Sequence, residues 1–428
     1  MSAENNYNKI LDLINEQEVW RENCINLIAS ENVISKSVRA AIASDFGHRY
    51  AEGILTVNDR VNFDRFYQGT KIFDKVEEFC MKLSEKMFNA DHANVVPISG
   101  AVANLTTYYA LTKPDDTIAG LSIHDGGHIS HTHISSAGAH ALHDLSYVFD
   151  HKEMNIDVDA SIKMIKKLKD KNKNKCPKLM IFGGSLFLFP HPVSEMRDIA
   201  DEIGAKIMYD AAHVLGLICG GKFQQPFSEG ADVVTSSTHK SFPGPQGGIV
   251  MCKSELAKKI DRAAFPGLMS NHHLHHVAGF AVALCEMEKY GKSYATQILK
   301  NAKFLAEAMY EEGFNVLCEH KGFTESHQVV VVFSKNGGGA VAAEKLEDAN
   351  IIINKNLMPW DVDSASKDPS GIRIGTPEVT HIGMKESDMG YIAEFMRRVV
   401  IDKEKTEFVK KDVIEFKKNF DKIHYCFD

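Results

Sequence analysis

Helical and strand patterns alternate along the first half of the chain, and this alternation restricts the fold more than any other feature. The segments in order are helix 71–88, strand 93–99, helix 101–112, strand 178–184, helix 194–204 and strand 205–210. Such alternation is typical of a largely parallel sheet covered by helices. Ligands of these sheets bind beyond the carboxyl ends of the strands, so polar residues at predicted strand ends are candidates for a site.

The pattern changes near residue 280, where a long helical stretch begins and short strands follow it. Apolar spacing predicts that helix over 278–313 and a strand over 328–334, and 402–420 reads as an amphipathic helix that packs on the protein. We expect two domains, which a chain of 428 residues is long enough to form. The predicted division is an N-terminal arm over 1–30, a large domain over 31–277 and a smaller domain over 278–428.

Composition and charge exclude several classes of protein. The chain is 44% hydrophobic and 25% charged, as ordinary globular proteins are, and its formal net charge of -8 comes without the basic block that nucleic acids require. Its eight cysteines form no C-x-x-C pair, which argues against a disulfide framework or a zinc knuckle. No signal-like start is present, and no apolar run approaches the roughly 18 residues that span a bilayer. We expect a cytoplasmic protein without nucleic-acid or membrane partners.

A lysine stands at an unusual place in 232-DVVTSSTHKSFPGPQGGIV-250. A β-branched strand is predicted to end at Val234, four hydroxyl residues follow over 235–238, and a Pro/Gly turn sends the chain back. In most proteins a lysine at a strand end is structural or solvated. Lys240 differs because Ser99 and Asp210 also stand at predicted strand ends. These residues are expected to share one site.

This set of residues suits one cofactor. A carboxylate such as Asp210 can keep a pyridine nitrogen protonated, and an amine such as Lys240 can form an imine with an aldehyde. Ser99 and Gly100 begin a predicted helix whose first turn offers backbone N–H groups to a phosphate. Pyridoxal 5'-phosphate carries all three of these groups, so the sequence predicts a pyridoxal-phosphate site.

Motifs along nearly the whole chain carry a family resemblance. In chain order they are 27-LIASEN-32, 49-RYAEG-53, 126-GGHISH-131, 210-DAAHVLGL-217, 237-STHKSFPGPQGG-248, 265-FPG-267 and 370-SGIRIGTPEVT-380. With these motifs the chain resembles the serine hydroxymethyltransferases among the fold-type-I pyridoxal-phosphate enzymes, and the archaeal forms more than the bacterial ones. The resemblance implies an α/β fold, with a large domain on a mostly parallel sheet and a smaller C-terminal α+β domain.

The resemblance also implies roles for individual residues. Lys240 would carry the cofactor as an imine, Asp210 would pair with its pyridinium nitrogen, and His128 would stack on its ring. The implied cofactor-binding residues are Ser99, Gly100, Ala101, Asp210, His213, Ser237, His239, Lys240 and Gly267. The implied catalytic residues are Lys240, Glu52, His128 and Tyr50, and the implied substrate-binding residues are Ser30, Tyr67 and Arg373.

Some of these residues are expected to act across a subunit boundary. By the resemblance, Tyr50, Glu52 and Tyr67 would reach in from the neighbouring subunit, so the active unit would be a homodimer with shared sites. Glu52 is then the expected proton shuttle on the β-hydroxyl group of the substrate. Arg373 with Ser30 would hold the substrate carboxylate, a role that suits a bidentate guanidinium.

The implied reaction is the reversible interconversion of serine and glycine, with one carbon transferred to a reduced pterin, either tetrahydrofolate or tetrahydromethanopterin. Departures from the family lie mostly on the pterin side: a longer loop over 54–64, a histidine-rich run over 268–276, 380-THIG-383, and a displaced serine in 183-GGSLF-187. They leave open a pterin-independent threonine aldolase or threonine transaldolase. A transaminase and a catalytically inactive relative that binds a partner or RNA are further alternatives.

Several other residues are expected to have structural roles. Without a nearby carboxylate or cysteine, the histidines of 268–276 are expected to form a loop near the cofactor, and no metal site is expected. His131 is expected in a loop or behind the site, and Asp232 is as well suited to capping or pairing as to catalysis. Tyr109 and Phe182 are expected in the core.

Overall fold

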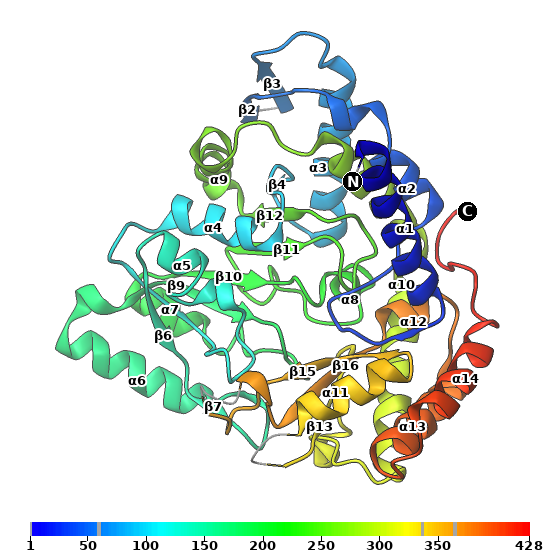
Figure 1. Ribbon diagram of the computed structural model, residues 1–428. Helices are drawn as coiled ribbons and strands as arrows, with labels where there is room; N and C mark the ends of the chain where they lie inside the picture. The colour runs from blue at the N-terminus through cyan, green and yellow to red at the C-terminus, as the bar shows by residue number, and fades with distance from the viewer. Residues whose placement is uncertain (1, 58–60, 335–337, 363–365) are drawn as a thin grey trace.

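A seven-stranded sheet is the frame on which the site is built (Figure 1). The computed structural model describes residues 2–57, 61–334, 338–362 and 366–428. In order across the sheet, the strands are β4 (His92–Asn94), β12 (Gly248–Cys252), β11 (Val233–Ser237), β10 (Lys206–Asp210), β9 (Pro177–Gly183), β5 (Thr117–Gly120) and β6 (His143–Ser146). β12 runs antiparallel to both of its neighbours, and the other pairs are parallel. The predicted largely parallel sheet is therefore confirmed.

Both faces of this sheet are apolar. Successive side chains of a strand point to opposite faces, and in this sheet the side chains on each face are buried. In β10, Ile207 and Tyr209 pack in the main core, whereas Met208 packs in a separate cluster with Tyr108. A parallel strand that is covered on both faces reads as a continuous apolar run, which is why 205–210 is recognisable from the sequence. Phe182 is also buried, as predicted.

Helices cover the two faces. The face of Met208 is covered by α4 (Gly100–Leu111), α5 (Ser136–Ala139) and α9 (Ala257–Arg262). The opposite face is covered by α2 (Lys36–Ile42), α3 (Lys71–Phe88), α6 (Val158–Lys171), α7 (Arg197–Ile203), α8 (Leu215–Cys219) and the first part of α10 (Leu274–Glu311). Tyr109 was expected in the core, and this prediction is wrong: its side chain on α4 is 49% exposed because it lies outside the apolar stripe that holds Tyr108.

The hydroxyl-rich segment after Val234 differs from the prediction, because β11 does not end there. Thr235 pairs with Asp210 of β10 and with Val250 of β12, and the ladder with β12 continues to Ser237. β-branched threonine fits a pleated strand, and beyond Thr235 the ladder with β12 alone holds Ser236 and Ser237 in the sheet. The hydroxyl groups therefore lie inside the sheet, and Lys240 begins the return turn three residues beyond the strand.

A second core forms around the C-terminal third of the chain. It contains a three-stranded sheet, β13 (Gln328–Val332), β16 (Gly371–Gly375) and β15 (Asn354–Asn356), and a parallel pair, β1 (Ile25–Asn26) with β14 (Ile351–Ile352). Its helices are α11 (Gly339–Asp348), α12 (Pro377–His381), α13 (Glu386–Val400) and α14 (Thr406–Lys417). α10 spans 38 residues and contributes its first part to the main core and its last turns to this second core. The domain division at 277/278 stays a prediction.

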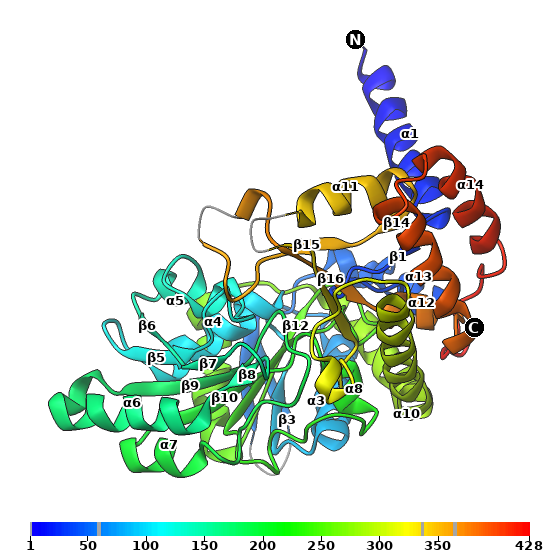
Figure 2. The same ribbon diagram turned by 90° about the horizontal axis from the view of Figure 1, so that it is seen from below.

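Two peripheral elements project from this body. α1 (Ala3–Glu22) has no buried residue and extends away from the rest of the chain in Figure 2. β2 (Gly53–Val57) and β3 (Val61–Arg65) form a hairpin, so the longer loop noted over 54–64 is a hairpin whose residues 58–60 lie outside the described residues.

The remaining short elements connect the larger ones. They are β7 (Phe149–Asp150), β8 (Asn155–Ile156), and the short helical turns Asp45–His48, Ile129–His131, Lys173–Lys175, Ser254–Leu256, Ala263–Leu268 and Glu319–Lys321. Within the described ranges, no helix combines the length and apolarity needed to cross a membrane.

Candidate active site

The carboxylate of Asp210 lies at the end of β10, on the side of the sheet that α4 covers. Its position follows from strand alternation, because Asp210 is two residues beyond Met208 and shares its face. The side chain is 4% exposed. Its Oδ1 atom accepts a 3.0 Å hydrogen bond from the N–H of Ala212, and its Oδ2 atom accepts bonds from Asn104 and His131, each 2.8 Å long. The contacts from Asn104 and His131 come from other segments that the fold brings to the strand end.

Asn104 connects the buried polar groups of this site. Its Nδ2 group donates to Asp210 and to the hydroxyl of Ser130, both at 2.8 Å. Its Oδ1 atom accepts a 2.6 Å hydrogen bond from the hydroxyl of Thr235, which fixes the orientation of the amide. The sequence analysis missed Asn104, Ser130 and Thr235 as site residues. The available signal was an amide side chain in a predicted helix that also carries the residues Ala103 and Tyr108 on its buried face.

Asp210 is held in its ionised form. Burial by itself raises the pKa of this carboxyl, but the hydrogen bond and the charge of His131, with smaller contributions from His128 and Asn104, hold the pKa well below its ordinary range. A carboxylate can only accept, so the Nε2 atom of His131 carries the proton. His131 thus lies directly behind Asp210, consistent with a supporting role rather than with contact to substrate.

His128 is neutral, and its ring is fixed. Ser130 donates from both its hydroxyl, at 2.7 Å, and its backbone N–H, at 3.2 Å, to Nδ1 of His128. The backbone N–H of Ser130 can only donate, so Nδ1 of His128 is an acceptor and the Ser130 hydroxyl donates to it as well. Burial lowers the pKa of His128 to about 4. His128, His131 and Asp210 each offer a possible metal-ligand atom, and these three atoms lie within 4.8 Å of one another. The three side chains are already engaged in the hydrogen bonds with Ser130 and between His131 and Asp210.

The side chain of Lys240 is half-buried, and its amine is desolvated. Burial lowers its pKa to about 8, although Asp210 acts in the opposite direction, and the charge of Arg373 lowers it further. Among the described residues, no ion pair engages this lysine. A lysine with this pKa is partly deprotonated near neutral pH, so its nitrogen is available as a nucleophile.

The start of α4 lies against the end of β11. Ser99 caps this helix by accepting a 3.2 Å hydrogen bond from the N–H of Val102. The N–H groups of Gly100 and Ala101 precede the first intrahelical partner and face outward from the helix end. A Cβ atom on Gly100 would lie 3.1 Å from the backbone nitrogen of Ser237, so glycine allows the helix start and the strand end to approach closely. This cradle of N–H groups and hydroxyls suits a phosphate.

Arg373 points from the second core toward the first. It lies on β16 between Ile372 and Ile374, which face the second core, so its guanidinium takes the opposite direction. It donates to the backbone oxygen of Ser185 and, at 3.1 Å, to Asn354. Burial lowers its pKa to about 10, which leaves it charged at neutral pH and without a carboxylate partner among the described residues.

Ser30 lies near β16, the strand that carries Arg373. The backbone oxygen of Leu27 accepts from Gly375, and a Cβ atom on Gly375 would lie 2.3 Å from Cα of Ala29. The segment that carries Ser30 is therefore packed against the end of β16. The structure brings both predicted carboxylate-binding residues to the junction of the two cores.

His213 is buried between the two cores. Gln328 of β13 bonds Nδ1 of His213 at 3.1 Å and donates to the backbone oxygen of Ser185 at 3.0 Å. The ring of His327 stacks on His213 with centroids 5.7 Å apart. Burial, with the charges of Lys240 and Arg373, keeps the pKa of His213 well below its ordinary value, so the imidazole is neutral. His327 and Gln328 were not predicted as neighbours of the site.

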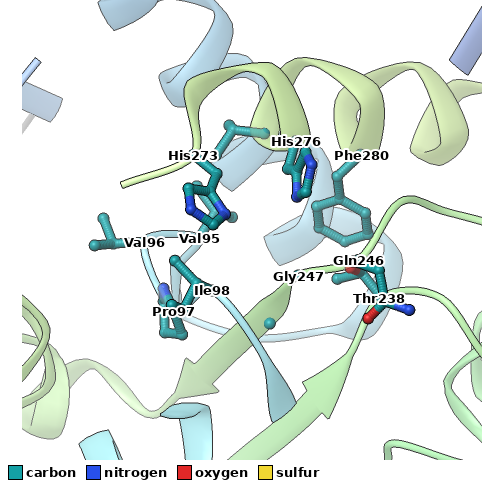
Figure 3. A pocket seen from close by; sticks show the side chains of 12 residues that line it. Val95, Val96, Pro97, Ile98, Thr238, Gln246, Gly247, His273, His276 and Phe280 are labelled. Atoms are coloured by element: carbon teal, nitrogen blue, oxygen red, sulfur yellow. The ribbon is translucent and has the colours of Figure 1, made fainter. Parts of the chain in front are cut away.

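His239 and the histidine-rich run lie around the turn that carries Lys240. Burial lowers the pKa of His239 to about 4. Figure 3 shows a pocket beside this turn, with Thr238 and Gln246 on one side and with His273 and His276, from the start of α10, on the other. The run over 268–276 is thus near the Lys240 turn. Ser237, at the end of β11, is 2% exposed beside the start of α4.

Three of the predicted residues form a separate group outside this site. The rings of Tyr50 and Tyr67 are 5.3 Å apart and are 54% and 42% exposed. Glu52 follows in the same segment and accepts a hydrogen bond from the hydroxyl of Ser270. Gly267 lies near this side of the molecule, where a Cβ atom would be 3.2 Å from the ring of Tyr109. In the described part of the chain, none of these four residues contacts the Lys240 and Asp210 group through a hydrogen bond or a ring contact.

The residues present fit pyridoxal 5'-phosphate. A half-buried lysine without an ion pair, a buried carboxylate held ionised, and a capped helix start all open toward the ends of β10 and β11. The neutral ring of His128 lies on the same side. These groups match the aldehyde, the pyridine nitrogen and the phosphate of the cofactor, so the sequence prediction and the geometry agree on its class.

Known proteins resemble this chain over nearly its full length. A crystal structure of L-threonine transaldolase from Pseudomonas fluorescens, in its internal aldimine state, superposes with a TM-score of 0.87 at 27% identity, covering 99% of this chain and 95% of that one. Serine hydroxymethyltransferases from Methanocaldococcus jannaschii and Pyrococcus abyssi are 54% and 50% identical over 98% of this chain and 95% and 96% of their own lengths. The fold-type-I class and the dependence on pyridoxal phosphate are confirmed.

The family model described as serine hydroxymethyltransferase matches residues 3–396. That range contains every residue named above from Ser30 to Arg373, so the whole candidate site falls within the match. The chain belongs to the serine hydroxymethyltransferase family.

Proposed function

We propose that this protein is a pyridoxal-phosphate-dependent enzyme that interconverts serine and glycine and passes one carbon to a reduced pterin. The observation that carries the proposal is that a lysine whose pKa is lowered to about 8 lies in the same site as a buried, ionised carboxylate at the end of the adjacent strand. When bound, pyridoxal phosphate accepts the electron pair left at Cα of serine as the bond to the hydroxymethyl carbon breaks. The protein groups decide where the cofactor binds and which bond is broken.

Asp210 and its neighbours would keep the pyridine nitrogen of the cofactor protonated. The carboxylate would keep the proton on the pyridine nitrogen of the cofactor, because an ionised and fully hydrogen-bonded Asp210 stabilises that cation. Asn104 and His131 fix the carboxylate, so no reorganisation is needed when charge develops. His128 presents a neutral ring whose orientation Ser130 determines, as stacking on an aromatic cofactor requires.

Lys240 and Arg373 would bind the cofactor and the substrate carboxylate, respectively. Lys240 would hold the cofactor through its amine nitrogen. Arg373, charged and buried without a carboxylate partner among the described residues, would bind the substrate carboxylate with help from Ser30. Its hydrogen bonds to Ser185 and Asn354 orient the guanidinium before substrate arrives.

We further propose a cytoplasmic homodimer in which Tyr50, Glu52 and Tyr67 complete the site of the partner subunit. Glu52 would move the proton of the substrate β-hydroxyl. The exposed tyrosine rings support this assignment, because large apolar groups at a functional segment suit burial against another chain. α1 adds a further exposed apolar surface, formed by Tyr7, Ile10, Leu11, Leu13, Ile14 and Val19.

The alternative of a threonine transaldolase rests on one structural likeness at 27% identity. Curated serine hydroxymethyltransferases are about twice as similar in sequence, at 50% and 54% identity, and this difference favours hydroxymethyl transfer. The lengthened hairpin remains the feature that motivates the alternative. The reduced pterin can be tetrahydrofolate or tetrahydromethanopterin, and both belong in the test.

Absorption spectra and serine cleavage by wild type, Lys240→Ala and Lys253→Ala test the proposal. Lys253 is a matched control, because it pairs with Asp232 and lies away from the Asp210 end of the sheet. We expect a visible cofactor band in wild type and Lys253→Ala, and its loss together with serine cleavage in Lys240→Ala.

Adding each reduced pterin separates the candidate reactions. A pterin that raises the rate of serine cleavage supports the hydroxymethyltransferase. Cleavage that responds only to an aldehyde acceptor supports the transaldolase. A wild type that shows no cofactor band after incubation with pyridoxal phosphate contradicts the whole enzyme class and favours a binding protein.

A further inference from the structure

The backbone that carries Tyr50 and Glu52 is held by side chains from two other segments. Asn271 donates through Nδ2 to the backbone oxygen of Arg49 at 3.0 Å and accepts the N–H of Ala51 at 3.1 Å. One amide side chain therefore bonds the peptide groups on both sides of Tyr50. The hydroxyl of Ser270, the preceding residue, donates to the carboxylate of Glu52.

Arg65 holds the same segment from the hairpin. Its Nη1 atom donates to the backbone oxygen of Ala51 at 2.5 Å, so both polar groups of Ala51 are bonded by side chains. The backbone oxygen of Glu52 accepts from Phe66 at 2.9 Å, and Gly53 pairs with Arg65 in the hairpin. Every peptide group around Glu52 is therefore tied to the hairpin or to the segment 270–271.

The guanidinium of Arg65 is itself fixed by two carboxylates. It donates to Asp74 at 2.8 Å and to Glu77 at 3.0 Å, and its side chain is only 5% exposed. Glu77 also pairs with His272 at 3.0 Å. Burial raises the pKa of Glu77, but His272 and Arg65 outweigh it, and the net shift is downward. A planar guanidinium with three partners has one orientation, which a lysine cannot reproduce.

We propose that Arg65 and Asn271 are positioning residues that hold the Tyr50 to Glu52 segment so that Glu52 meets the hydroxyl group of the substrate. The inference rests on the proposed function of Glu52. Misplacing a proton-transferring group by about 1 Å can lower a rate on the order of 10²-fold, so a clamp outside the site controls catalysis without touching substrate. The histidine-rich run, a departure from the family, supplies Asn271, and Arg65 directly follows the longer segment over 54–64.

A double-mutant cycle tests the inference. We expect Arg65→Lys and Asn271→Ala each to lower kcat for serine cleavage by about tenfold or more, and to change it less than about twofold when Glu52→Gln is already present. Exchange of the glycine α-proton with solvent should stay within about twofold of wild type, because glycine lacks the hydroxyl group that Glu52 serves. The visible cofactor band should be retained in both variants.

The matched control is Arg197→Lys, which alters another part-buried guanidinium that contacts Asp232, Asp201 and Gly230 at the other end of the sheet. It should lower the thermal midpoint and leave kcat unchanged. Equal loss of kcat in the presence and absence of Glu52→Gln, or slowing of glycine exchange as strong as that of serine cleavage, overturns the inference. If Arg65→Lys does not fold, the same comparison of kcat with and without Glu52→Gln, and of glycine exchange, is made with Asn271→Ala alone. Full activity of Glu52→Gln alone contradicts the proposed function and, with it, this inference.

Discussion

At the scale of single residues, the candidate site is a line of buried hydrogen bonds that sets the charge of each group. Thr235 orients Asn104, and Asn104 bonds both Asp210 and Ser130. Ser130 in turn fixes His128. Asp210 is therefore ionised and His128 neutral because of neighbours from β11, α4 and the segment 128–131, and removing any one of them leaves a buried polar group without its partner.

Asp210→Asn should abolish most activity without loss of fold. The amide keeps the shape of the side chain but cannot stabilise a protonated pyridine nitrogen, and we expect kcat for serine cleavage to fall by about 10² or more. Steady-state kinetics with cofactor content measured on the same sample checks this result.

Asp232→Asn provides the contrast. Asp232 is also buried, but it accepts from Arg197 and from the backbone of Ile207 at the opposite end of the sheet. Its replacement should lower stability by about 1–3 kcal/mol and leave kcat unchanged at a temperature where the protein is folded. Equal effects of the two substitutions on kcat would contradict a specific role for Asp210.

At the scale of elements, the junction of β9 and β10 determines where Asp210 lies. Gly183 ends β9 with φ of +85°, and a Cβ atom there would lie 2.0 Å from the backbone oxygen of Asp210. Its N–H donates to Nδ1 of His191 at 2.9 Å, which orients the peptide. Glycine is required both by the left-handed backbone and by the close approach of the neighbouring strand.

Gly183→Ala should therefore be far more harmful than Gly204→Ala. Gly204 ends α7 with φ of +74°, but a Cβ atom there would have no neighbour within 4 Å. We expect Gly204→Ala to cost about 1–2 kcal/mol from backbone strain alone. Gly183→Ala should cost about 3 kcal/mol or more, with loss of cofactor binding, because strain and overlap with Asp210 add. Thermal midpoints and cofactor content measured on both variants distinguish the two effects, and equal losses would contradict the account.

At the scale of the whole molecule, the site lies between two cores and is completed, in our proposal, by a second chain. Arg373 reaches from the second core to Ser185 of the first, and α10 contributes to both cores. The position of Arg373 in the site therefore depends on how the two cores are packed against each other as well as on the fold of each core. Tyr50 and Glu52 lie elsewhere on the chain and are the residues proposed to serve the partner subunit.

Hybrid dimers test this proposal directly. A dimer that joins one Lys240→Ala chain to one Glu52→Gln chain should have about half of the wild-type activity, because one of its two sites receives both intact residues. Co-expression with two affinity tags, followed by purification through both, gives this hybrid for kinetic measurement.

The reciprocal hybrid is the control. A chain that carries both substitutions, joined to a wild-type chain, should be inactive, because each site then lacks one residue. If Glu52 acts within its own chain, the outcomes reverse: the first hybrid is inactive, and the second keeps about half of the activity.

The sequence by itself determined the layered α/β fold, the strand ends that carry Ser99, Asp210 and Lys240, and the class of cofactor. These follow from local information: apolar periodicity predicts strands and helices, and parallel strands bring their carboxyl ends to one edge. The family motifs added roles for residues such as Arg373, whose partners lie far away in the chain.

Only the tertiary structure decided which protonation states the site has and what supports it. Asn104, Ser130 and His131 became part of the site because α4 and the segment after β5 pack against the end of β10. β11 continued through its hydroxyl residues because the ladder with β12 extends to Ser237, which local propensity does not reveal. The clamp around Glu52 joins residues more than 200 positions apart. Burial, and with it the pKa of Lys240 and Asp210, depends on all of these distant contacts at once.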